Sequence, residues 1–208
     1  MNFAGNGFFI AILFAAVAAT LGIGFLIYTL YKKAKSSTKD VKNKAQKPLS
    51  VAKGFAKLHE YTLISPCNLA KDGKFADVDF AVVGYFGVLG VKCIGLGGEI
   101  YGSSGDAMWL QVTNTQRISF ENPLIRAQAD ARLIRDTLFA AGLKSVPVEV
   151  ICVCTNPKAS LALPRSTGHF TMKDYKAYLK KDKFEQDKKV DLEATVAAIS
   201  KWRTETSV

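Results

Sequence analysis

The sequence has few of the residues that build disulfide frameworks and metal centres. It contains four cysteines and two histidines in 208 residues, and no C-x2-C pair. So few cysteines, without framework spacing, are typical of a protein kept in a reducing compartment. A zinc site built from all four cysteines is the alternative, but structural zinc sites usually use close cysteine pairs. We therefore expect buried free thiols at Cys67, Cys93, Cys152 and Cys154.

Common phosphate-binding and catalytic motifs are also missing. The glycine-rich residues 95–98 lack the GK[ST] sequence of a P-loop and the helix that follows a dinucleotide-binding loop, so they predict a turn. Neither His59 nor His169 lies in a pattern that indicates a nucleophile and its base. Hydrolysis by a Ser-His triad is therefore not indicated.

Charge is absent from the first 31 residues. Residues 8–31 are 24 mostly apolar residues without interruption, and as a helix they would reach roughly 36 Å. Because backbone in lipid must satisfy its own hydrogen bonds, we expect one transmembrane helix here, after a short extracytoplasmic tail at residues 1–7. A cleaved signal peptide is the alternative, but it has a positive start and a shorter apolar core. Small residues on one face are compatible with a transmembrane dimer; they are Ala11, Ala15, Ala18 and Gly22.

Lysines follow the apolar run at once. Seven lie in a predicted juxtamembrane linker at residues 32–48, beginning with Lys32, Lys33 and Lys35, whereas the tail has no Lys or Arg. The positive-inside rule therefore predicts a single-pass cell-membrane protein with its N-terminus outside and its C-terminal domain in the cytoplasm. We expect the lysines to attract anionic inner-leaflet lipids as well as the bilayer itself. Of the net charge of +10, this linker with Asp40 accounts for +6, so the remaining +4 does not by itself indicate nucleic-acid binding.

Residues 49–208 predict one α/β domain, a mixed sheet flanked by helices. Apolar spacing predicts helices at 49–60, from Asn122-Pro123 to Gly142, at 172–179 and at 192–202. Runs rich in β-forming residues predict strands at 61–64, 78–83, 87–94, 99–102, 108–112 and 146–154. Only three residues separate the runs 78–83 and 87–94, which predicts a hairpin.

Several ordered motifs resemble a known family. They are ADVDFAVVGYFGVLGVKCIGLGGEIYG at residues 76–102, W-x-Q at 109–111 and ENPL at 121–124. Together they resemble the nuclease-related domain (NERD), a branch of the PD-(D/E)XK, restriction-endonuclease-like superfamily, over about residues 61–179. Members are often bacterial and often carry a transmembrane helix. The resemblance implies a central mixed sheet with flanking helices.

The resemblance also implies a catalytic constellation. In the family an Asp on one hairpin strand and a Glu-x-Lys on the next converge on a divalent metal, which activates water for phosphodiester hydrolysis. The Asp position falls on Asp79, and the Glu-x-Lys position falls on Lys92 and Ile94. A lysine in the carboxylate position repels a cation, so we expect no metal cofactor and an ion pair between Asp79 and Lys92. The motif is degenerate, and the resemblance then implies catalytic inactivity.

Three functions remain open. The first is an inactive nuclease-related module at the inner face of the membrane that binds nucleic acid or protein. The second is an active, Mg²⁺-dependent nuclease with a site rebuilt around Asp79 from nearby carboxylates such as Asp77, Glu99 and Asp106. The third is a membrane-associated scaffold that contacts only proteins.

Overall fold

The computed structural model describes residues 44–204. The predicted tail, transmembrane helix and most of the lysine linker, including Lys32, Lys33 and Lys35, lie outside the described residues. Between residues 44 and 204, no helix has the length and apolar character needed to cross a membrane.

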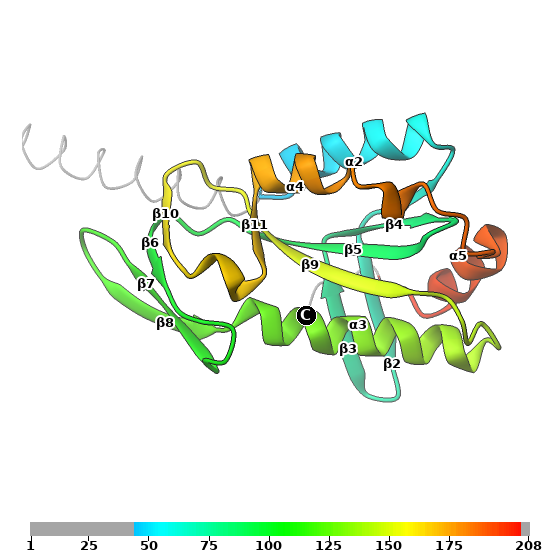
Figure 1. Ribbon diagram of the computed structural model, residues 1–208. Helices are drawn as coiled ribbons and strands as arrows, with labels where there is room; N and C mark the ends of the chain where they lie inside the picture. Colours follow the sequence, from blue (N-terminus) through cyan, green and yellow to red (C-terminus); the bar gives the residue numbers. More distant parts are fainter. Residues whose placement is uncertain (1–43, 205–208) are drawn as a thin grey trace, which may run out of the picture. The chain divides into compact units, whose positions relative to one another are not determined.

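A five-stranded mixed sheet forms the centre of the domain (Figure 1). Its strands, in spatial order, are β1 (Thr62–Ile64), β4 (Phe80–Gly84), β5 (Gly87–Ile94), β9 (Val148–Cys154) and β11 (His169–Thr171). β1, β4 and β5 are antiparallel neighbours, whereas β5, β9 and β11 run parallel. The predicted hairpin is confirmed, and its turn is tight, because Gly84 pairs with Gly87.

Helices cover both faces of this sheet (Figure 1). Side chains alternate along a strand, so Phe80 and Val82 of β4 pack beneath α2 (Gln46–Leu58) and α4 (Met172–Tyr178). Ala81 and Val83 point to the other face, where they pack with α3 (Pro123–Ala140) and α5 (Leu192–Lys201). The predicted mixed sheet flanked by helices is therefore confirmed. Its helices fall near the predicted positions, although α2 begins at Gln46 and so inside the predicted linker.

The Asn-Pro sequence explains where α3 begins. The Asn122 side chain accepts a hydrogen bond from the Leu124 N–H at 2.9 Å and so caps the helix. Pro123 is the first helical residue, where the missing N–H costs nothing. The Asn122 amide also donates to the carbonyls of Ser103, Ser104 and Asp106, which ties the helix start to the preceding loop. At the other end Gly142 has a φ of 85°, which favours glycine and ends the helix as predicted.

Two further sheets complete the described part of the chain. A four-stranded sheet contains β10 (Ala159–Ala162), β6 (Gly98–Tyr101), β7 (Met108–Val112) and β8 (Arg117–Glu121), in that order. A separate hairpin pairs β2 (Cys67–Lys71) with β3 (Lys74–Val78). Two short 3₁₀ turns, η1 (Arg165–Thr167) and η2 (Asp182–Phe184), lie in the C-terminal part. The sequence patterns predicted β6 and β7 but missed β2, β3, β8, β10 and β11 as strands.

Candidate functional site at the start of strand β4 and the end of strand β5

Asp79 lies in the bend between β3 and β4, beside the end of β5. Its carboxylate has two partners: Oδ2 accepts a hydrogen bond from the Cys93 N–H at 2.7 Å, and Oδ1 lies 3.4 Å from the ammonium of Lys44. Lys44 comes just before α2, in a segment that the sequence assigned to the linker. Asp79 is thus held by the backbone of β5 and by a lysine from the start of the domain.

Lys92 is the next member of the constellation, and its partners differ from the predicted one. Its ammonium lies 3.1 Å from Asp130 Oδ2 and 3.4 Å from Asp77 Oδ2, and it also donates to the Asp77 carbonyl. The expectation of an ion pair between Asp79 and Lys92 is therefore wrong. The physical reason is the difference in burial between the two carboxylates. Asp130 is fully buried and gains more from a neighbouring cation than Asp79, because water partly solvates Asp79.

Asp130 is the residue that sequence reasoning missed. It lies on α3 with no exposed surface, and its Oδ1 is 3.6 Å from Arg126 Nε, one helical turn earlier. Burial raises the pKa of its carboxyl, and the charges of Lys92 and Arg126 oppose that rise. A signal was present in the sequence, because Asp130 falls on the apolar face of the helix beside Ala127, Ala131 and Ile134. A charged residue at such a position needs a buried partner.

Ile94, which the resemblance assigns to the position of the family lysine, is an ordinary core residue. It is buried and packs with Ala127, Cys152 and Cys154. Its carbonyl accepts hydrogen bonds from the N–H and hydroxyl of Thr155. An isoleucine donates no proton and carries no charge, so nothing at this position can orient a water molecule as the family lysine does.

The oxygen atoms at this centre do not form a set that fits a divalent cation. Asp77 and Asp130 share the ammonium of Lys92, and Asp79 is engaged by Lys44 and the Cys93 N–H. Glu99 and Asp106 lie elsewhere, on β6 and in the turn that follows it. Across residues 44–204 no group of three or more His, Cys, Asp or Glu side chains is placed to hold a metal ion. The positive charge at this centre is supplied by Lys92 instead.

The cysteines behave as predicted, as buried free thiols. Burial raises the pKa of the Cys152 and Cys154 thiols to about 12, and it raises that of Cys93 further. A thiol with such a pKa is protonated at neutral pH and is a poor nucleophile. Cys93 enters the centre through its backbone N–H and not through its sulfur.

Comparison with known proteins gives one family match. No curated protein and no solved structure is significantly similar to the chain. A sequence model described as the nuclease-related domain matches residues 39–155, a span that contains Lys44, Asp79, Lys92 and Asp130. This span is more than half of the chain, and the chain therefore belongs to the nuclease-related domain (NERD) family.

Proposed function

We propose that this NERD protein is a catalytically inactive member held at the inner face of the cell membrane, where its domain binds nucleic acid or protein. The mixed sheet with helices on both faces supports a restriction-endonuclease-like fold, which the family resemblance implies. The function then depends on what the chain retains of the family's metal-dependent chemistry.

The observation that carries the proposal is the position of the Lys92 ammonium. It lies between the carboxylates of Asp130 and Asp77, where a family member would place a metal ligand. A cation brought there would meet a like charge at close range, and the carboxylates already have a partner. With Ile94 in place of the family's one motif lysine, the expected positions supply neither a ligand for the ion nor the water-orienting group of the family mechanism.

The membrane part of the proposal depends on the sequence of residues 1–47. The apolar run and the lysines after it support a single-pass anchor with the NERD domain in the cytoplasm. The lysine-rich linker would then lie against anionic lipids, and each lysine near the surface contributes about 1 kcal/mol to the attraction.

A cleavage assay tests catalytic inactivity. The full 208-residue chain is incubated with DNA and RNA in the presence of Mg²⁺ or Mn²⁺, beside the variants Asp79→Ala and Asp79→Asn. The asparagine variant keeps an acceptor for the Cys93 N–H, so it separates loss of charge from loss of fold. Asp136→Asn, on an exposed face of α3, is the matched control. We expect no metal-dependent cleavage by any of the four proteins.

Cleavage by the parent and by Asp136→Asn, but not by either Asp79 variant, would show a rebuilt nuclease site and refute the proposal. If none of the proteins cleaves, a salt titration of DNA and RNA binding identifies the ligand class. Affinity that falls steeply with salt indicates a nucleic-acid module. No binding at low salt indicates the protein-binding scaffold.

A further inference from the structure

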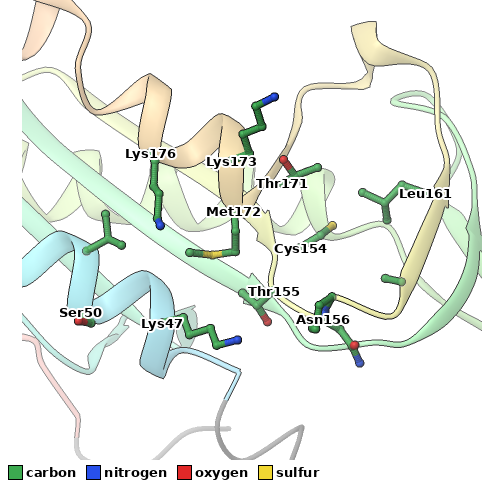
Figure 2. Close-up of a pocket in the computed structure, with 13 residues that line it drawn as sticks. Lys47, Ser50, Cys154, Thr155, Asn156, Leu161, Thr171, Met172, Lys173 and Lys176 are labelled. Carbon is green, nitrogen blue, oxygen red and sulfur yellow. The ribbon is translucent and has the colours of Figure 1, made fainter.

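A lysine-lined pocket (Figure 2) shares no residue with the ion-pair centre, the cluster of Lys44, Asp77, Asp79, Lys92 and Asp130 described above. It has a volume of about 570 Å³ and lies between the first turns of α2, the loop after β9, strand β10 and the start of α4. Such a volume falls within the range of roughly 300–1,000 Å³ that is usual for small-molecule sites. The pocket is therefore large enough for a ligand of the size of a mononucleotide.

The charge on this pocket has one sign. Lys47, Lys173 and Lys176 line it, and no aspartate or glutamate does. None of the three lysines takes part in an ion pair with another described residue. Figure 2 shows Lys176 reaching from α4 toward α2 and Lys47 lying below Thr155, whereas Lys173 points away from the centre. Two unpaired ammonium groups therefore face the pocket and a third lies at its rim.

The neighbouring carboxylate is already engaged. Asp174 follows Lys173, but its side chain accepts hydrogen bonds from the N–H and hydroxyl of Thr171 and closes the capping box of α4. Those contacts lower the pKa of the Asp174 carboxyl. The Asp174 carboxylate is held at the start of the helix. Between residues 44 and 204 it forms no ion pair with the pocket lysines, although the nearby charge of Lys173 also lowers its pKa.

The remaining lining is mostly apolar. It is contributed by Val51, Cys154, Pro157, Ala159, Leu161 and Met172. Ser50 and Thr155 also line the pocket, and Figure 2 shows Thr155 just above Lys47. An apolar wall beside two ammonium groups and a few hydroxyls suits a ligand with a flat apolar body and a compact anionic end. Lysine binds phosphate as a point charge, whereas planar carboxylates are better matched by arginine.

We propose that this pocket binds a nucleoside monophosphate, with its phosphate at Lys47 and Lys176 and its base against Val51, Leu161 and Met172. The same chemistry is offered by a free nucleotide and by the 5′-phosphorylated end of a nucleic-acid strand. The inference goes beyond the proposed function, because it requires neither the anchor nor a particular state of the ion-pair centre.

Calorimetric titration of the full chain with adenosine 5′-monophosphate tests the proposal. Inorganic phosphate, adenosine and two single-stranded oligonucleotides, one with a 5′-phosphate and one with a 5′-hydroxyl, are titrated in parallel. The test variant is Lys47→Glu/Lys176→Glu. Its matched control is Lys53→Glu/Lys180→Glu, which makes the same change of net charge from the same helix α2 and from just after α4, outside the pocket. Lys47→Gln/Lys176→Gln and a thermal unfolding curve show whether the fold is kept.

We expect the nucleotide, or the 5′-phosphorylated strand, to bind more tightly than phosphate or adenosine alone. We expect the Lys47/Lys176 pair of substitutions to weaken that binding by about tenfold or more, and the control pair to leave it nearly unchanged.

Binding of the strand without binding of the free nucleotide identifies a strand end as the source of the ligand. Three results would overturn the proposal. The first is an equal loss of binding affinity in the test and control double variants, and the second is no binding of any ligand. The third is equal affinity for the two strands without binding of the free nucleotide. Nuclease activity would contradict only the proposed function and would leave this test intact.

Discussion

Asp130 has no exposed surface, so the protein must supply the stabilisation that water would give its carboxylate. Lys92 is itself largely buried and provides most of it, at 3.1 Å, while Arg126 approaches the other oxygen from the helix surface. A buried ion pair gains little over a well-packed apolar pair, but breaking it leaves a charge without a partner. The stability of the domain is therefore sensitive to Lys92.

Substitution of Lys92 by methionine tests this dependence. We expect Lys92→Met to lower the free energy of unfolding by about 3–5 kcal/mol, since Asp130 is left buried and unpaired. The double variant Lys92→Met/Asp130→Leu should regain most of that loss, because Arg126 and Asp77 are exposed enough to be solvated. Urea unfolding of the three proteins measures these differences.

The control is Lys183→Met, which breaks the exposed ion pair with Glu149. We expect it to cost less than about 1 kcal/mol. If Lys92→Met and Lys183→Met lower the free energy of unfolding equally, water must reach Asp130, and the buried ion pair then matters no more to stability than an exposed one.

The hairpin of β4 and β5 places Lys92, which the resemblance assigns to the family motif, against Asp130 of α3. The sequence predicted this hairpin correctly because two β-rich runs with a short turn between them leave few alternative ways for the strands to pair. The pairing of Asp79 with Lys44, and of Lys92 with Asp130, did not follow from the sequence. Those contacts join segments 35 or more positions apart, and strand periodicity carries no information on which helix residue faces a given strand.

Short strands were missed for a related reason. β10 and β11 have only four and three residues, and neither pairs with the strand next to it in the chain: β10 pairs in parallel with β6, and β11 with β9. β2 and β3 flank a turn at Asp72-Gly73, and Lys71, Lys74 and Asp77 interrupt the apolar pattern of the two strands. Long periodic segments such as α3 and β9 were predicted well because their own residues determine them. The short strands depend on partners supplied by the rest of the fold.

The substitution Lys92→Glu tests whether this hairpin still has the geometry of a metal site. A carboxylate at this position would meet those of Asp77 and Asp130 and the Asp77 carbonyl, all oxygen ligands of the kind that Mg²⁺ and Mn²⁺ take. We expect Lys92→Glu to be less stable than the parent without metal and to gain thermal stability when Mg²⁺ or Mn²⁺ is added. The parent and Lys92→Gln should show no such gain. A metal response as large in Lys92→Gln, or none in Lys92→Glu, would mean that the hairpin no longer holds a metal geometry.

For the complete chain we propose a membrane anchor and a charged linker that lead into the NERD domain. Lys44 belongs to the folded part through its contact with Asp79, so a truncation that begins at Pro48 would remove both this contact and the start of α2. Experiments on the domain are therefore best made on the full chain. The lysines before Lys44 remain available for the membrane surface in this proposal.

The arrangement in the membrane is tested by reporters fused to the C-terminus. We expect a fluorescent protein there to fluoresce and alkaline phosphatase to remain inactive, because the lysines after the apolar run favour a cytoplasmic C-terminus. The mass of the purified protein should equal that of the full chain, since a cleaved signal peptide would remove the apolar run. The protein should stay in the membrane fraction after a high-salt wash, because a spanning helix is held by apolar burial and salt screens only the lysines.

Substitution of Lys32, Lys33 and Lys35 by glutamine should increase the fraction with active phosphatase, whereas glutamine at Lys53, Lys57 and Lys180, within the folded domain, should not. Equal shifts in the two triple variants would show that Lys32, Lys33 and Lys35 do not set the orientation. Release of the parent protein by salt would show that the apolar run does not span the bilayer.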